Sequence, residues 1–484
     1  MGCRMRKIWT VVAAGLLSVS PLVLRAETLT DALISAYRNS NLLEQNQAVL
    51  RAADEDLATA VGTLLPVFSY AVDIGANATY DHDPGLGIVN GKVVTLPNQS
   101  EFSTSTTLSL IASIPLFDFG RGQHTIALRN ELVLASQQSL VAVEQDVLLD
   151  AVSAYVDMGL QSELVAAQQS NVRLITQDLR ATRDRFEVGE VTRTDVALAE
   201  AQLASANSAL AGAQGSYNVA RERYKAAIGH YPGKLSGLPK LPTTARTIDG
   251  ARDIALRTHP VVLQAQHQAK ASDYGVELAR AEMMPTIEGS ASLSQTFSGD
   301  NAAPLFSGGS SGAINERFGI SMKQTIYAGG RLSSALRKSI AQQQSSHAGL
   351  LQTGVNVDEA VGRAWSNILV ANVSIEAGDQ QIRAAQAAYD GVKQEAELGS
   401  RTVLDVLDAE QNLLSAKATR LQAAANFYVS QYQLLSAMGL LTANHLRLGI
   451  PTFDPSAYLN AVKNAPATSG RGAKLDRILK TLGK

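Results

Sequence analysis

Two very long stretches of this 484-residue chain, residues 116–231 and residues 305–450, contain no proline. An interior proline costs an α-helix about 3 kcal/mol, so such stretches are typical of long helices. Both are rich in alanine, leucine, glutamine and glutamate, which favour helix formation. We expect each stretch to hold a long helix, a tight turn near Gly189 or Gly399, and a second helix.

The second helix of each stretch carries apolar residues at steps of three and four. This spacing is a heptad seam, typical of helices that pack as coiled coils, and an ordinary helical bundle is the alternative. Many seam positions hold alanine, which indicates a close approach of the helices. The two seams are Val196, Ala199, Leu203, Ala206, Leu210, Ala213, Tyr217, Ala220 and Tyr224, and Leu414, Ala418, Leu421, Ala425, Tyr428, Tyr432 and Leu435.

Four other segments alternate apolar with polar residues, which predicts β-strands with one apolar face. They span about residues 67–80, 104–119, 286–297 and 316–328. The pattern fits either a soluble sandwich or a membrane barrel with an apolar outside. About eight strands are the minimum for a closed barrel, so a barrel would need several copies of the chain.

The N-terminus has the features of a secretory signal peptide. Basic residues precede the only long apolar run, residues 8–24, and Ala26 follows it. We expect residues 1–26 to be a cleaved signal peptide, and an uncleaved membrane anchor is the alternative. Cys3 is the only cysteine, which excludes a disulfide framework. No other stretch reaches the roughly 20 apolar residues of a spanning helix, so membrane contact would need strands or a surface helix.

Composition and motifs argue against several functions. The 42 basic and 44 acidic residues nearly balance, whereas nucleic-acid binding would need a basic stripe. The seven histidines show no metal-ligand spacing. Gly308-Gly309-Ser310-Ser311-Gly312 matches a nucleophile motif but lies in a loop between strands rather than on a strand-to-helix turn. We therefore expect no enzyme activity, no cofactor, no metal site and no nucleic-acid partner.

The two halves of the chain are copies of each other. Residues between Ala32 and Pro66 recur 219 positions later, because Pro66 returns as Pro285. Around the predicted turns the offset is 210, because Gly189 returns as Gly399. Each half is predicted to run helix, strand, loop, strand, long helix, turn, helix.

The repeat divides the chain into five parts. After the signal peptide come a first repeat, 27–228, with its tip near residue 189, and a linker, 229–246. A second repeat, 247–437, has its tip near residue 399, and a C-terminal extension, 438–484, follows. We expect the extension to be a partly ordered periplasmic segment.

At this point the chain resembles the TolC family of outer-membrane channel proteins, over about residues 29–448. The prolines before the strands and the segment Ala255–Pro260 are similar to the family. The most specific segments are Val188-Gly189-Glu190 with Thr194-Asp195-Val196, and Leu398-Gly399-Ser400-Arg401-Thr402 with Leu404-Asp405-Val406-Leu407-Asp408.

The resemblance implies a mixed α and β protein of coiled-coil helices and β-hairpins. Three copies would form a 12-stranded membrane β-barrel in the outer membrane, with an α-helical barrel in the periplasm. This homotrimer would be the exit duct of a tripartite export system, joined by a periplasmic adaptor (membrane fusion) protein to an inner-membrane transporter of the RND or ABC type. A type I protein-secretion duct, rather than a small-molecule efflux duct, is one alternative. A soluble periplasmic coiled-coil spacer is the other.

The resemblance also implies a gate at the helix tips. Arg401 and Thr194 would form one polar link that closes the periplasmic entrance, and Asp195 would be half of another. The family partner of Asp195 is a tyrosine, whose place is taken here by Ala396, with Phe186 at the equivalent place in the first repeat.

Two further roles follow from the resemblance. Asp405 and Asp408 would form acidic rings at the constriction, which attract cations. A solvated acid in the first turn of a helix is the alternative for Asp405. The turns that would contact the adaptor are Val188, Gly189, Glu190, Leu398, Gly399 and Ser400.

Overall fold

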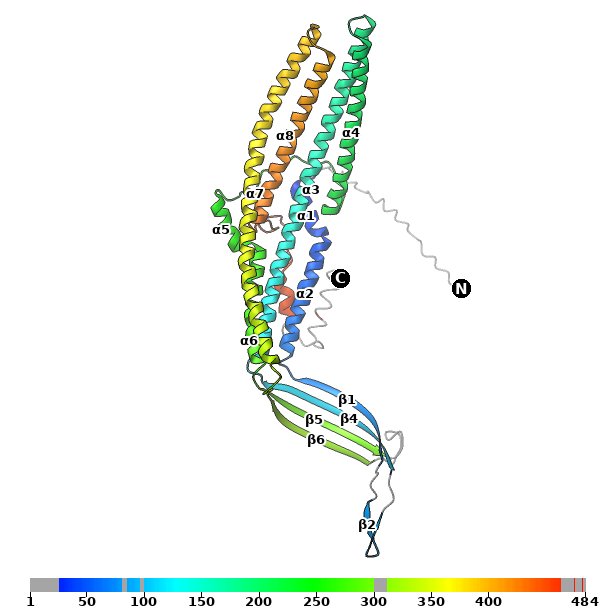
Figure 1. Cartoon of the computed structure of the whole chain (residues 1–484), viewed down its shortest axis with the longest axis vertical. Coiled ribbons are helices and arrows are strands. Elements are labelled where there is room, and N and C mark those ends of the chain that lie inside the picture. Colours follow the sequence, from blue (N-terminus) through cyan, green and yellow to red (C-terminus); the bar gives the residue numbers. More distant parts are fainter. Residues whose placement is uncertain are drawn as a thin grey trace, which may run out of the picture.

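The computed structural model of the chain describes residues 26–80, 85–95, 100–299 and 311–462, together with Lys474 and Thr481. Residues 1–25 of the expected signal peptide, most of the loop with the G-x-S-x-G motif, and most of the C-terminal tail lie outside this part. The molecule is a long rod with helices along most of its length and a sheet at one end (Figure 1). The two helical tips lie at the opposite end from the sheet.

The helices fall into two sets that repeat the same order. Two of them, α3 and α7, have 67 residues each, which corresponds to about 100 Å at a rise of 1.5 Å per residue. The helices are α1 (Leu29–Asn39), α2 (Asn41–Gly62), α3 (Arg121–Glu187), α4 (Arg193–Ile228), α5 (Ile248–Thr258), α6 (Pro260–Ala281), α7 (Arg331–Glu397), α8 (Val403–Ala437) and α9 (Pro455–Val462). The expectation of two long helical hairpins is therefore confirmed.

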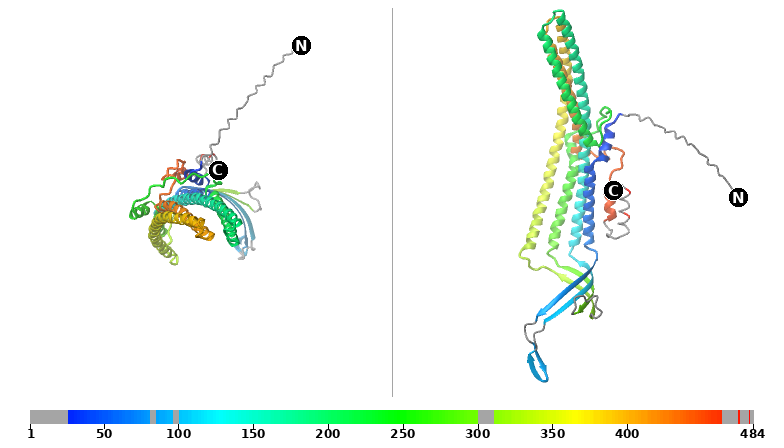
Figure 2. Two further views of the ribbon diagram at one scale, coloured as in Figure 1. Left: turned by 90° about the horizontal axis from the view of Figure 1, so that it is seen from above. Right: turned by 90° about the vertical axis from the view of Figure 1, so that its right-hand side faces the viewer.

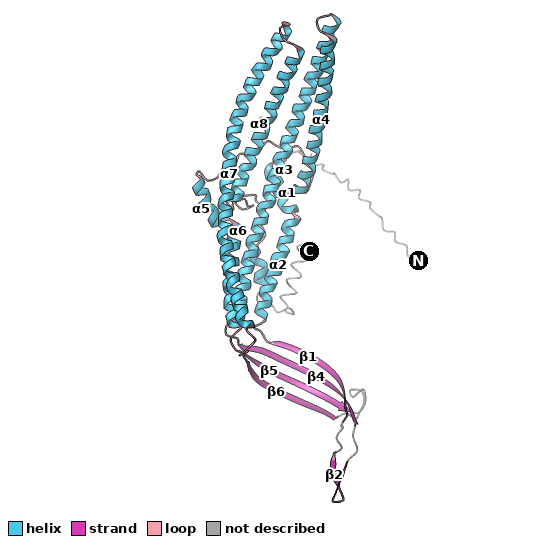
Figure 3. Cartoon of the chain, in the orientation of Figure 1, coloured by secondary structure: helices cyan, strands magenta, loops and turns pink. Residues whose placement is uncertain are grey.

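The strands form an antiparallel sheet of four, in the order β1-β4-β5-β6, and a separate small hairpin of β2 and β3 (Figure 3). The strands are β1 (Val67–Tyr80), β2 (Leu86–Val89), β3 (Lys92–Thr95), β4 (Ser100–Phe117), β5 (Thr286–Gly299) and β6 (Ser311–Lys323). The small hairpin lies in what the sequence predicted to be a loop.

Strand pairing explains where the strands differ from the predicted ranges. The second strand was predicted at about 104–119 but begins at Ser100, because β1 continues to Tyr80 and pairs with it there. The fourth was predicted at about 316–328 but ends at Lys323, which pairs with Thr286, the first residue of β5. The third runs to Gly299, two residues beyond its predicted end.

The repeat is present in the strand register. Val67 lies opposite Ser113 in the first hairpin and Thr286 lies opposite Lys323 in the second. These pairs differ by 219 and 210 positions respectively, which are the two offsets found in the sequence. The two hairpins therefore have the same register, and only their loops differ in length.

The leading helix of each repeat is split in two. Ser40 ends α1 and caps α2, since its hydroxyl accepts a hydrogen bond from the N–H of Leu43. In the second repeat His259 and Pro260 make the same break between α5 and α6. A proline at the first helical position fits the fixed backbone angle there.

The long helices form a curved layer, with α5 and the C-terminal segment on its convex side (Figure 2). The seam residues of α4 and α8 are buried or half-buried, as a coiled-coil packing requires. The main core lies where α1, α4 and α8 pack on the middle of α3, around Tyr155, Tyr224 and Leu148. No helix in the described part of the chain is long and apolar enough to cross a membrane.

The first part of the predicted C-terminal extension is integrated into this core. Leu441 and Leu448 are buried. The N–H of Ala443 donates to Glu144 Oε1 at 2.7 Å, and the hydroxyl of Tyr458 in α9 donates to Glu55 Oε1 at 2.7 Å. Residues 438–462 thus fasten the end of the second repeat to the first.

Asp54 of α2 is a buried acid whose two carboxylate oxygens have no hydrogen-bond partner within the described part of the chain. Its repeat equivalent, Asp273, accepts hydrogen bonds from Gln343 and His347 of α7, each at 2.8 Å. The positions equivalent to these partners hold Val133 and Gln137. Burial raises the pKa of Asp54 to about 6, and the nearby charge of Glu55 adds to the effect.

Ionised Asp54 should therefore destabilise the protein. We expect Asp54→Asn to stabilise it by about 1–3 kcal/mol at pH 8 and by much less at pH 4, where the folded carboxyl is neutral and the unfolded one is only about half ionised. Thermal unfolding of the purified protein at the two pH values measures this. Asp273→Asn is the matched control and should lower stability at pH 8, because it weakens a paired site. Equal stability of Asp54→Asn and the unaltered protein at pH 8 would contradict the prediction.

Candidate functional site at the helix tips

The two tips have the same backbone geometry. Gly189 and Gly399 have φ values of 82° and 77°, in the left-handed region that favours glycine. The N–H of Glu190 donates to the carbonyl of Arg185, and the N–H of Ser400 donates to that of Glu395, both at 2.9 Å. This bond is the mark of a helix ended by a glycine turn.

The helix after each tip begins with a capping box. Thr192 is the N-cap of α4, and its hydroxyl and N–H donate to Asp195 Oδ2 at 2.7 and 2.8 Å. Thr402 and Asp405 repeat this arrangement at α8, at 2.8 and 3.0 Å. Hydrogen bonds from the backbone and the hydroxyl of each threonine hold the pKa of the two aspartates below the ordinary value. Asp195 and Asp405 therefore stay ionised near neutral pH.

Each tip also carries an ion pair across its turn. Arg185 Nε lies 3.1 Å from Glu190 Oε2 in the first tip, and Arg401 Nε lies 2.9 Å from Glu395 Oε2 in the second. The charges are in opposite order along the chain, with the acid before the turn in the second tip. Both pairs are exposed, so they contribute little stability on their own.

The predicted gate residues lie at the tips but do not meet within one chain. Thr194 is exposed, and Arg401 is bonded to Glu395 of its own hairpin. Across the described ranges, no hydrogen bond or ion pair joins one tip to the other. The link between Arg401 and Thr194 therefore stays a prediction that concerns other hairpins of an assembled channel.

The remaining predicted positions are accessible. Asp408 is exposed one turn after Asp405, so both carboxylates lie on one side of α8. Val188 and Leu398 have exposed fractions of 71% and 86%, which is unusual for large apolar side chains and fits a contact surface. Ala396 is buried, whereas the equivalent Phe186 is half-exposed.

Sequence reasoning missed two pairs of supporting residues. Thr192 and Thr402 position the aspartates, and the T-x-x-D spacing before each helix was a visible signal. Arg185 and Glu395 hold the turns, but nothing in their spacing distinguishes them from ordinary helical charges.

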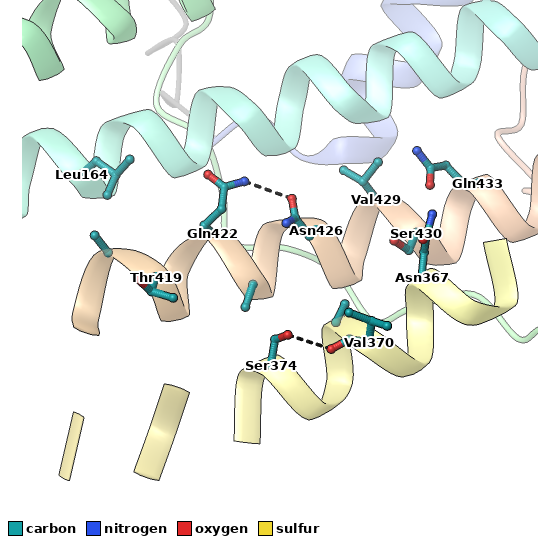
Figure 4. A pocket seen from close by; sticks show the side chains of 13 residues that line it. Leu164, Asn367, Val370, Ser374, Thr419, Gln422, Asn426, Val429, Ser430 and Gln433 are labelled. Carbon is teal, nitrogen blue, oxygen red and sulfur yellow. Dashed lines mark hydrogen bonds between the residues drawn. The ribbon is translucent and has the colours of Figure 1, made fainter. Parts of the chain in front are cut away.

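Between the tips and the sheet, α3, α7 and α8 enclose a groove of about 820 Å³. Figure 4 shows its polar side chains, among them Asn367, Ser374, Gln422 and Asn426. Gln422 Nε2 donates to Asn426 Oδ1 at 3.0 Å. All the lining residues are uncharged.

Comparison with known proteins assigns the family. Residues 33–230 and 251–440, which correspond to the two repeats, match the family model described as outer membrane efflux protein. The chain belongs to the outer membrane efflux protein family. It is accordingly an outer-membrane channel protein of the efflux and secretion class and not an enzyme.

Members of this efflux family cover nearly the whole chain. The outer membrane efflux protein BepC of Brucella suis biovar 1 (strain 1330) is 31% identical, over 94% of this chain and 95% of its own. The outer membrane protein TolC of Escherichia coli (strain K12) is 25% identical, over 98% and 94%. The alkaline protease secretion protein AprF of Pseudomonas aeruginosa is 24% identical, over 78% of each chain.

Solved structures agree on the fold. The CmeC outer membrane channel of Campylobacter jejuni matches with a TM-score of 0.70 at 17% identity, over 90% of this chain and 89% of that one. The predicted fold class and the predicted outer-membrane location are both confirmed.

The capping box of the second tip gives a testable consequence in this efflux-family chain. In Thr402→Val the hydroxyl cap is lost, so the first turn of α8 should exchange its amide hydrogens about five times faster. Exchange measured by mass spectrometry over residues 403–406 tests this. The matched control, Thr192→Val, should affect only the first turn of α4. Unchanged exchange in Thr402→Val would show that the cap does not hold the tip.

Proposed function

We propose that this chain is the exit duct of a tripartite export system. Three copies would span the outer membrane and reach into the periplasm. There they would meet a periplasmic adaptor and an inner-membrane transporter of the RND or ABC type. The observation that carries the proposal is a sheet with one exposed apolar face and two open edges, attached to paired helical hairpins.

The apolar face supports insertion into lipid. The register places Tyr70 beside Leu110 and Leu110 beside Leu293, so apolar side chains of different strands share one face. Phe318, Ile320 and Met322 of β6 are largely exposed. This exposed apolar surface disfavours the soluble coiled-coil spacer, because contact of apolar side chains with water is unfavourable.

The open edges support assembly from copies of the chain. β1 and β6 are at opposite edges of the sheet and are each paired on one side within the described chain. Open edges do not occur in lipid, because unpaired backbone groups are costly there. Three sheets of four strands joined edge to edge would give twelve strands, enough to close a barrel.

The internal repeat predicts the register in which the edge strands of neighbouring copies would pair. In the repeat, β6 is equivalent to β4 and β1 to β5, so β6 of one copy would pair with β1 of the next as β4 pairs with β5. Leu110 lies opposite Leu293. Their equivalents are Ile320 (110 plus 210) and Ile74 (293 minus 219). We therefore place Ile320 of one copy opposite Ile74 of the next.

The tips would then form the gate. With three copies around one axis, Asp405 and Asp408 would be repeated in rings that favour cations. Arg401, Thr194 and Asp195 would link neighbouring hairpins in the closed state. The exposed turns at residues 188–190 and 398–400 would contact the adaptor.

Two forms of this proposal differ in the substrate that the duct would export. The 31% identity to an efflux protein, BepC, favours small-molecule export. The 24% identity to a protease secretion protein, AprF, favours a type I protein-secretion duct. The higher identity and fuller coverage make the efflux duct our first choice.

Conductance in a planar lipid bilayer tests the duct and its gate together. We expect a cation-preferring pore of low conductance, and a several-fold rise in Arg401→Ala because one link of the closed tip is lost. Arg185→Ala removes the corresponding ion pair of the first tip and serves as the control. Unchanged conductance in Arg401→Ala would leave the duct and remove Arg401 from the gate. Absence of any pore from folded protein would count against the duct.

Cysteine cross-linking tests the joint between copies. In a Cys3-free background, Ile320→Cys with Ile74→Cys should give cross-linked oligomers up to the trimer on a denaturing gel. Within one chain these residues lie three strands apart and eight residues out of line, because the register places Ile74 level with Gly312 of β6. The cross-link must therefore join copies. The control pair, Ile320→Cys with Phe68→Cys, lies on the same face but six residues out of register and should not react. Equal reaction of both pairs would contradict the register.

A further inference from the structure

The two hairpins differ at one charged pair behind the tips. In the first hairpin Arg183 of α3 and Glu200 of α4 form an exposed ion pair, with Arg183 Nη2 2.6 Å from Glu200 Oε1. The repeat equivalents in the second hairpin are Lys393 of α7 and Glu410 of α8 (each 210 positions later). The same pair of charges is thus present in sequence, but the structure does not join it.

Glu410 is buried instead. Its exposed fraction is 5%, and neither carboxylate oxygen has a hydrogen-bond partner among the residues that the structure describes. It occupies a core position of α8, on the same face as the buried Leu407 and Leu413. An ionised carboxylate without partners is costly in such a place.

The groups that face Glu410 come from two helices. From α3 comes Asp178, whose Oδ2 atom is also buried without a partner. From α7 come Tyr389 and Lys393, and the Lys393 ammonium lies over the Tyr389 ring, 5.9 Å from its centre. Burial, together with the charge of Asp178, raises the pKa of Glu410 to about 7, and the charge of Lys393 opposes the shift. Burial likewise raises the pKa of Asp178.

The position of this cluster relates it to the tips. Asp178 lies eleven residues before Gly189 and Glu410 lies eleven residues after Gly399 (189 minus 178; 410 minus 399). At 1.5 Å per residue the cluster is about 16 Å from the turns, where Glu410 of α8 is close to Asp178 of α3. A change in the contact between α8 and α3 there would move the second tip relative to the first.

We propose that Glu410 and Lys393 are further gate residues, in which neutral Glu410 keeps α8 packed on α3 and ionised Glu410 favours separation of α8 from α3 and pairing with Lys393. The first hairpin shows that this pairing is sterically available, since Arg183 and Glu200 make it there. The inference rests on the proposed duct and adds a response to pH to its gate.

The direction follows from the two protonation states. Below about pH 4 the carboxyl is neutral whether buried or hydrated, so it favours neither arrangement. As the pH rises towards 7 and beyond, the hydrated carboxylate is favoured over the buried one, and the packed arrangement is lost. Each unit by which burial raises the pKa corresponds to a tenfold shift in the equilibrium.

Two measurements on the full-length protein test the proposal. In a planar bilayer, channel opening by the unaltered protein should increase about tenfold between pH 5.5 and pH 8. Glu410→Gln should stay at the low value at both pH values. In detergent, amide exchange over residues 405–413, corrected for the intrinsic effect of pH, should show the same pattern. The matched control, Glu200→Gln, changes the equivalent exposed acid and should keep the pH response.

Lys393→Met is the second variant, and because Lys393 is exposed it leaves the core intact. It should reduce the opening at pH 8 and leave pH 5.5 unchanged, since only the ionised carboxylate uses the ammonium. The proposal would be overturned if Glu410→Gln kept the pH response or if Glu200→Gln lost it equally. It would also be overturned if Lys393→Met left the pH response unaffected. Should no variant form a pore, the duct fails, and the exchange pattern alone decides whether α8 and α3 separate with pH.

Discussion

The rod depends on the equal length of its two long helices. Both α3 and α7 begin after a left-handed glycine at the sheet, Gly120 or Gly330, and run 67 residues to a glycine turn. Because the lengths match, the strand hairpins lie at one level and the two tips at another. An insertion in only one of these helices would shift its tip relative to the other and separate the residues expected to form one gate.

The repeat also shows where the two halves have diverged. The two strand hairpins keep the same register, whereas α3 buries more of its residues than α7 does. Several charged groups also differ. Within the described residues, Asp273 accepts hydrogen bonds from side chains whereas Asp54 accepts none. Glu200 forms an ion pair, whereas its equivalent Glu410 does not. At the tips, Glu395 stands where the first repeat has Arg185.

Much of the fold follows from local pattern. Proline-free stretches, heptad spacing and alternation identified the long helices and the four strands, because each rests on a period of the backbone. The strand ends were less accurate, since the end of β6 is set by where β5 begins at Thr286, a residue far along the chain. The packing of residues 438–462 was missed for the same reason, because its partners Glu144 and Glu55 belong to the first repeat.

The candidate site was predicted only in part, because motif and environment carry different information. The tip turns were evident from their glycines, and the aspartates came from the family resemblance, while the T-x-x-D spacing that caps both helices was missed. Glu410 was not evident, because its sequence surroundings resemble those of Glu200 and only the packing of α8 on α3 buries it. A buried acid without partners lowers stability, and a neutral residue of similar shape would be favoured if stability alone mattered. Its presence at a core position of α8, near Asp178 and Lys393, fits the proposed two-state element, because neither arrangement satisfies every one of these groups at every pH.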